Sequence, residues 1–207
     1  MAKLLHISAS PRGDRSASIT VAKHFIKAYQ AKHPGDIIET LDLWSVPLPE
    51  FDGATIDAKY AVLRGLAHTP EEREAWQAVV RIAEHFKSAD KFLFSLPMWN
   101  FGLPYKLKHF IDLLVQPGLT FSFSPTEGYK GLVTDKPAVA IYARGGAYGP
   151  GTGMEGYDLQ SSYLKSALGF IGITDLKPIF VEPTLGAPKE EVEEKAKKQA
   201  DEIAAAF

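Results

Sequence analysis

The stretch of sequence that decides the fold is Phe92-Leu-Phe-Ser-Leu-Pro-Met-Trp-Asn-Phe-Gly-Leu-Pro-Tyr105. Its first five residues are almost entirely apolar or aromatic, which predicts a strand buried on both faces. Pro97 ends that strand, and Pro104 opens a helix, where its missing N–H costs nothing. A loop with an aromatic residue, an amide and a glycine therefore follows the carboxyl end of a strand. Open parallel sheets bind ligands at that edge, so we expect this loop to lie against a flat heterocycle.

Strand and helix patterns alternate on both sides of this stretch. Strands are expected at residues 3–8, 37–41, 91–96, 137–143 and 176–181, and helices at 16–29, 70–87, 104–115, 157–171 and 189–202. This alternation predicts an α/β protein with a flavodoxin-like three-layer α/β/α arrangement. The expected sheet has five parallel strands in the order 2-1-3-4-5, within a single domain over residues 1–207. Residues 43–69 are expected to be irregular. These residues and residues 117–135 are both insertions beyond a minimal version of the fold, and a functional or interfacial role is expected for them.

Composition restricts the class of function. The 207 residues carry a formal net charge of −2, which argues against nucleic acid or an anionic membrane as a partner. The chain has no cysteine, so disulfides, a thiol nucleophile and cysteine-ligated metal sites are excluded, which fits a cytoplasmic protein. The N-terminus lacks a long apolar segment and is expected to be a first strand, not a signal peptide.

The loop after the first expected strand has the composition of an anion site. Ser10, Ser16 and Ser18 supply hydroxyl groups, and the following helix begins with free N–H groups. A phosphate here would be held mainly by neutral donors, with Arg12 and Arg15 as neighbouring charges. Taken alone, this loop is better explained by Ser16 as a helix cap within a serine-rich turn, which is common.

Two further loops are expected at the same edge of the sheet. In the second, the aromatic residues could be core or interface residues, but that reading leaves Asn100 at a strand end unexplained. In the third, Gly145 and Gly146 follow a strand directly, which permits close approach of a ligand to the backbone. An ordinary turn is the alternative, with Arg144 exposed and without a role. The coincidence of three such loops on one edge favours a binding site.

At these residues the chain resembles the FMN-dependent NADH:quinone oxidoreductases, also called FMN-dependent NADH-azoreductases. The resemblance spans nearly the whole chain and includes Leu168-Gly-Phe-Ile-Gly-Ile-Thr-Asp175. It implies that the FMN phosphate binds Ser10, Ser16, Ala17 and Ser18, that the isoalloxazine lies along Pro97, Met98, Trp99, Asn100 and Phe101, and that its pyrimidine end contacts Ala143, Arg144, Gly145 and Gly146. The family often has tyrosine in place of Trp99 and serine in place of Ala143. Backbone contacts would survive both differences, whereas a hydroxyl contact would not.

The resemblance also implies an activity and an assembly. NADH, or NADPH, would reduce FMN and leave, and a quinone or an azo compound would then take the electrons as a pair in a ping-pong mechanism. The flavin carries this chemistry, so no catalytic side chain and no metal is expected. The resemblance implies a homodimer with active sites at the subunit interface, where Phe123 and Phe170 would border the substrate. Core packing is an equally good explanation for Phe170.

The sequence leaves two alternative functions open. A flavodoxin-like one-electron carrier would share the fold, but such carriers are typically strongly acidic, and a net charge of −2 is not. A relative that has lost the flavin and acts as an interaction protein is the second alternative.

Overall fold

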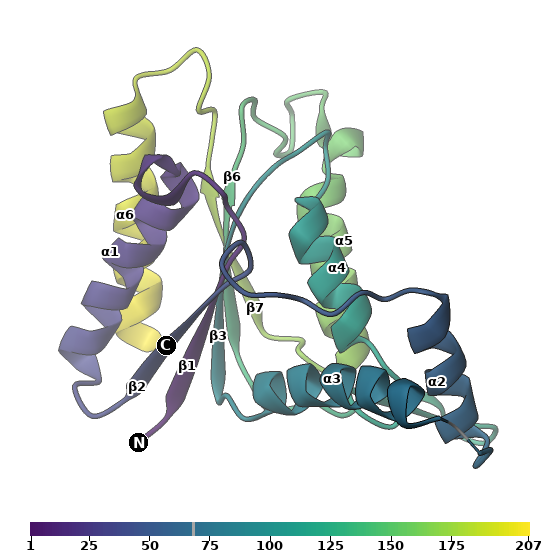
Figure 1. The fold of residues 1–207 in the computed structure, drawn as a ribbon. Helices are drawn as coiled ribbons and strands as arrows, with labels where there is room; N and C mark the ends of the chain where they lie inside the picture. The colour runs from purple at the N-terminus through teal and green to yellow at the C-terminus, as the bar shows by residue number, and fades with distance from the viewer. Residues whose placement is uncertain (68) are drawn as a thin grey trace.

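The computed structural model describes residues 1–67 and 69–207, with a five-stranded parallel sheet at its centre (Figure 1). The strands are β1 (Lys3–Ser8), β2 (Ile37–Asp42), β3 (Lys91–Pro97), β6 (Ala138–Ala143) and β7 (Leu176–Val181). They lie in the order β2-β1-β3-β6-β7, and every neighbouring pair is parallel. The predicted order 2-1-3-4-5 is therefore confirmed, since β6 and β7 are the fourth and fifth strands of this sheet.

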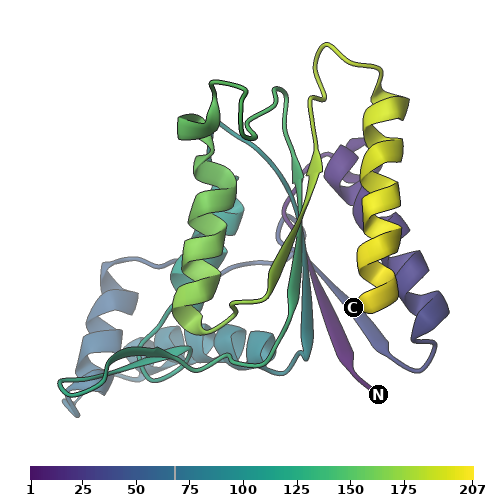
Figure 2. The same cartoon turned by 180° about the vertical axis from the view of Figure 1, so that it is seen from behind.

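Helices cover both faces of the sheet, as Figures 1 and 2 show from opposite sides. The helices are α1 (Ala17–Lys32), α2 (Gly53–Leu63), α3 (Pro70–Lys87), α4 (Tyr105–Leu114), α5 (Leu159–Ile171) and α6 (Lys189–Ala206), with 3-10 turns at Gly13–Arg15 and Glu155–Tyr157. α1 and α6 share one apolar layer with the sheet, whereas α3, α4 and α5 contribute to the layer on the other face. α2 packs against α3.

The two apolar layers follow from strands that are buried on both sides. Successive strand residues point to opposite faces, so Leu93 joins the layer under α1 and α6, while Phe92 and Phe94 join the other. Phe92 stacks on Phe86 of α3 with ring centroids 4.1 Å apart. The strongly charged α6 is held by small side chains at four-residue spacing, which face α1 and the sheet: Val192, Ala196, Ala200 and Ala204.

Two helices begin at a hydroxyl side chain that caps them. Ser16 caps α1, with its Oγ accepting from the N–H of Ile19 at 3.5 Å. Thr69 caps α3 through a reciprocal pair of bonds with Glu72, and Pro70 occupies the first helical position.

The expectation of irregular structure was wrong for residues 43–69. Residues 43–69, of which residue 68 lies outside the described part, contain α2, which Asp52 caps through the N–H of Thr55. This helix was missed because apolar residues occur on all its sides and form no stripe. Residues 117–135 contain a hairpin of β4 (Phe121–Ser124) and β5 (Gly128–Gly131).

The hairpin lies with its backbone directly against the end of α5. A Cβ added to Gly131 would lie 2.3 Å from the backbone nitrogen of Gly172, which is inside the contact limit of any two atoms. The N–H of Val133 donates to the carbonyl of Ile171 at 2.8 Å just beyond this contact. Two glycines are therefore needed where these segments cross.

Candidate cofactor site

A cavity of about 490 Å³ lies at the carboxyl edge of the sheet, and all three predicted loops contribute to it. From those loops it is lined by Ser10, Arg12, Arg15, Ser16, Ala17, Pro97, Met98, Trp99, Ala143 and Gly145. The predicted convergence of these loops is thus observed. Ser18, Asn100, Phe101, Arg144 and Gly146 do not line the cavity themselves, although each lies within one or two residues of a lining residue.

The first loop presents buried hydroxyls at the start of α1. Ser10 and Ser16 are 4% and 3% exposed, and Ser18 is fully buried behind them. The hydroxyls of Ser16 and Ser18 lie 3.1 Å apart. The first N–H groups of α1 have no partner within the helix, so hydroxyl and N–H donors converge where an anion would be most stable.

The second loop makes a two-residue turn between Trp99 and Gly102. These two residues exchange both backbone hydrogen bonds, at 3.1 and 2.9 Å. Asn100 and Phe101 between them have φ of 46° and 69°, the left-handed pattern of a type I′ turn. A phenylalanine there is uncommon. The turn leaves the backbone N–H groups of Asn100 and Phe101 without an acceptor among the described residues, so both are available to a ligand.

In the third loop, the side chain of Arg144 does not line the cavity, although its neighbours Ala143 and Gly145 do. Arg144 is 2% exposed, whereas its backbone lies beside the cavity. Its guanidinium donates to both oxygens of Asp158 at 2.8 and 2.9 Å, to Glu182 at 3.3 Å and to Gln160 at 2.9 Å. It also lies 4.4 Å from the ring centroid of Phe180. The alternative of an exposed Arg144 without a role was wrong, because this ion-pair cluster joins β6, β7 and the start of α5.

Backbone donors in the third loop are also unpaired. The N–H groups of Gly145 and Gly146 donate no hydrogen bond to any described residue. The carbonyl of Gly145 accepts from the N–H of Leu185 at 3.0 Å, and the carbonyl of Arg144 accepts from Thr184. These bonds attach the third loop to the segment after β7.

A fourth segment was missed by the sequence reasoning. Thr184, Leu185, Lys189, Val192 and Glu193 line the cavity from the loop after β7 and the start of α6. The topology alone could have indicated this segment, because β7 ends at the same edge of the sheet as β1, β3 and β6. Its loop has no motif of its own, so only the position of the strand pointed to it.

His6 is a buried titratable group within β1 that does not line the cavity. Its Nε2 lies 2.9 Å from the hydroxyl of Ser95, also buried. Burial lowers the pKa of His6 to about 4, partly opposed by Asp42. His6 is therefore neutral at neutral pH and acts as a hydrogen-bonding core residue.

Phe123 and Phe170 lie outside this cavity. Phe170 contacts Phe121 and Tyr129 of the hairpin, with ring centroids 4.8 and 5.5 Å away. It lines a separate cavity of about 430 Å³ near α4 and α5. Phe123 is 59% exposed on the hairpin. One chain alone does not bring these two residues to the cofactor cavity.

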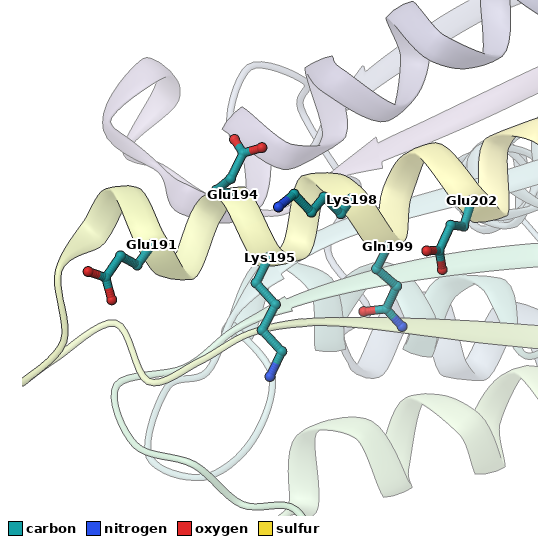
Figure 3. A pocket seen from close by; sticks show the side chains of 6 residues that line it. All are labelled: Glu191, Glu194, Lys195, Lys198, Gln199 and Glu202. Carbon is teal, nitrogen blue, oxygen red and sulfur yellow. The ribbon is translucent and has the colours of Figure 1, made fainter.

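A larger hollow, of about 730 Å³, lies on the outer face of α6 (Figure 3). All its lining side chains come from that one helix, and all are polar, with charges of both signs: Glu191, Glu194, Lys195, Lys198, Gln199 and Glu202. A single helix offers no opposing wall, so this surface is a solvated helix face. The cavity at the sheet edge is the better candidate because four separate segments enclose it.

Comparison with known proteins identifies the family. The family model described as "Flavodoxin-like fold" matches residues 2–205. An FMN-dependent NADH:quinone oxidoreductase of Desulfotalea psychrophila is 50% identical, over 99% of this chain and 97% of its own. One of Nitratidesulfovibrio vulgaris is 48% identical, over 98% and 100%. The chain belongs to the FMN-dependent NADH:quinone oxidoreductase family.

A solved structure extends this comparison. An FMN-dependent NADH-azoreductase of Bacillus anthracis in complex with FMN superposes with a TM-score of 0.92. It is 30% identical, and the match covers 100% of this chain and 99% of that one. Within the described residues, none of the helices has the length and apolar character needed to cross a membrane. The same residues contain no group of three or more side chains arranged to hold a metal ion.

Proposed function

We propose that this protein uses FMN to transfer two electrons from NADH, or NADPH, to quinones and to cleave azo compounds reductively by a ping-pong mechanism. The observation that carries the proposal is the set of unpaired backbone N–H groups on the second and third loops, beside a cavity with an anion site at its other end. Bound FMN would supply the hydride and electron transfer, and the chain's residues bind it, orient it and exclude water.

The phosphate end of FMN fits the first loop. The hydroxyls of Ser10 and Ser16 and the N–H groups of Ala17 and Ser18 would donate to its oxygens. Arg12 and Arg15 line the same cavity and would add positive charge. Ser18 would act through its backbone, since its buried hydroxyl pairs with Ser16.

The ring end fits the second and third loops. The N–H groups of Asn100 and Phe101 would donate to one edge of the isoalloxazine, and those of Gly145 and Gly146 to its pyrimidine end. Met98 and Trp99 supply apolar surface. All four donors are backbone groups, so the arrangement does not depend on a hydroxyl at position 99 or 143.

The FMN assignment is tested on the purified protein. We expect it to be yellow and to release FMN, not FAD, on heating, because the site holds one phosphate-sized loop. Recovery of FAD, or failure to reconstitute with FMN, would contradict the cofactor.

Steady-state kinetics tests the ping-pong mechanism. Initial rates with NADH and menadione should give parallel lines at several fixed quinone concentrations, because one flavin face serves both partners. Intersecting lines would contradict the shared face.

The alternative of a one-electron carrier is not supported. The relatives above are named as FMN-dependent NADH:quinone oxidoreductases or as an FMN-dependent NADH-azoreductase. Stopped-flow mixing of the oxidised protein with NADH alone discriminates, since a carrier would not be reduced rapidly by a dinucleotide.

The proposal includes a homodimer. Exposed apolar side chains gather on α5 and the hairpin, where Leu159, Tyr163, Phe170, Phe123 and Tyr129 are between 36% and 66% exposed. An apolar surface of this kind favours an interface. In a symmetric dimer, Phe123 and Phe170 would border the partner's cofactor cavity.

Light scattering tests the dimer. At low micromolar concentration we expect about twice the chain mass of 22.7 kDa. Tyr163→Glu should shift the population toward monomer, whereas Lys195→Glu on the outer face of α6 should not. A monomer in the unaltered protein would refute the assembly without bearing on the cofactor.

Gly145→Val tests the position of the flavin ring. An added Cβ at Gly145 would lie 3.0 Å from Cδ1 of Leu185, whose side chain is 76% exposed and free to turn away. The apoprotein should therefore remain folded, while the side chain narrows the cavity. We expect FMN binding to weaken at least tenfold, or about 1.4 kcal/mol, in a flavin fluorescence titration.

The control for this variant is Gly35→Val, in the turn between α1 and β2, where an added Cβ meets no atom within 4 Å. FMN affinity should be unchanged there. Unchanged FMN affinity in a less stable Gly145→Val would remove the third loop from the proposed site.

A further inference from the structure

Three aromatic side chains form a continuous surface at the edge of the cofactor cavity. Trp44 lies after β2, Trp99 is in the second loop, and Tyr105 begins α4. Ring centroids are 5.8 Å apart for Trp44 and Trp99, 5.3 Å for Trp44 and Tyr105, and 6.3 Å for Trp99 and Tyr105. We call these three residues the aromatic shelf. It adjoins the cavity because Trp99 lines it.

The shelf is held in place yet open to solvent. The indole N–H of Trp44 donates to the carbonyl of Ala9 at 3.1 Å, which fixes the ring against the first loop. The turn described above holds the backbone of Trp99. Trp99 and Tyr105 nevertheless remain 37% and 61% exposed. Exposed rings with fixed orientation lose little conformational freedom when a flat ligand stacks on them.

Unpaired positive charge lines the same cavity as Trp99 of the shelf. The carbonyl that holds Trp44 belongs to Ala9, three residues before Arg12 in the same loop. Arg12 and Arg15 are exposed, line the cavity, and form no ion pair with any described residue. Neutral donors at Ser10, Ser16 and the start of α1 would hold the FMN phosphate. One of the two arginines is enough to add positive charge there, so the other is available for a second anion.

We propose that the aromatic shelf binds the adenine ring of NADH, with Arg12 beside the diphosphate. An aromatic surface next to an unpaired cation suits a ligand with both a flat base and a phosphate group. A quinone has no anionic group to use the arginine. Stacking on aromatic side chains accepts any base, so the shelf would contribute affinity for the donor without hydrogen bonds to the adenine. This inference rests on the proposed oxidation of NADH.

Kinetics with two hydride donors tests the shelf in the FMN-loaded protein. Reduced nicotinamide mononucleotide lacks the adenylate half of NADH, so the ratio of its KM to that of NADH measures what the adenylate contributes. In Tyr105→Leu and Trp44→Leu we expect this ratio to fall about fivefold, with the KM for menadione unchanged. Tyr60→Leu on α2 is the matched control, since Tyr60 is 47% exposed and lies outside the cavity.

A binding measurement gives a second readout that needs no turnover. ADP is titrated into the protein, with and without FMN, and tryptophan fluorescence is followed. We expect saturable quenching that is about fivefold weaker in Tyr105→Leu and unchanged in Tyr60→Leu. Absence of quenching by ADP, or equal affinity in Tyr105→Leu, would overturn the inference. A higher KM for menadione with an unchanged donor ratio would assign the shelf to the acceptor instead.

The two proposals fail separately in these experiments. A protein that binds ADP on the shelf but never reduces FMN with NADH would refute the proposed function alone. A protein that oxidises NADH with an unaltered donor ratio in both shelf variants would refute only the adenine site.

Discussion

Arg144→Met is expected to lower the free energy of unfolding of the apoprotein by about 3 kcal/mol or more. The guanidinium lies between two carboxylates that are themselves largely buried, Asp158 with 17% and Glu182 with 15% of the side chain exposed. Removing it leaves both charges, and the side-chain oxygen of Gln160, without their partner. Urea unfolding of the apoprotein measures the change.

Two further variants separate the buried cluster from a general effect of charge. Arg144→Lys keeps the charge but loses the fork that donates to three side chains, so an intermediate loss is expected. Arg81→Met removes an exposed pair with Glu74 and should cost no more than about 0.5 kcal/mol. Equal losses in Arg144→Met and Arg81→Met would show that the cluster does not stabilise the fold.

The strands and the positions of the loops could be predicted from the sequence, whereas the burial of Arg144 could not. The five strands were predictable because each contains several apolar residues between turn residues, and their alternation with helices leaves few topologies. The position of the three loops followed from that topology. The burial of Arg144 did not, since its partners Asp158 and Glu182 lie 14 and 38 residues away in sequence and meet only in the folded chain.

Local conformation limited the prediction in a different way. Asn100-Phe101 has no glycine, so its sequence gave little reason to expect two left-handed residues in succession. That turn is what frees the two N–H groups next to the cavity. The fourth segment of the site was missed because Thr184 and Leu185 contribute position alone. Site residues could therefore be predicted where their side chains form a sequence motif. Site residues that contribute only through backbone conformation or position could be found only in the structure.

Gly131→Ala is expected to cost about 3 kcal/mol of folding stability, a large effect for one methyl group. The added carbon would lie 2.3, 2.4 and 2.6 Å from backbone atoms of Gly172 and Ile171. A side chain in that position could turn aside, but backbone atoms move only if the segments separate. Separation would break the bond from Val133 to Ile171 and free the hairpin. Thermal unfolding of the apoprotein measures the stability.

Gly131→Ala should also affect the proposed dimer, because the hairpin belongs to the exposed apolar surface. It carries Phe123 and Tyr129, so a displaced hairpin should also weaken the proposed dimer, and light scattering should detect monomer in folded Gly131→Ala. FMN affinity of the folded monomer should change little, because no hairpin residue lines the cofactor cavity. Gly169→Ala is the control: it lies in α5, an added Cβ meets nothing within 4 Å, and alanine should be neutral or stabilising by about 0.5–1 kcal/mol. If Gly131→Ala were as stable as Gly169→Ala, the close crossing of hairpin and α5 would not constrain the fold, and the hairpin would be free to leave α5 without cost.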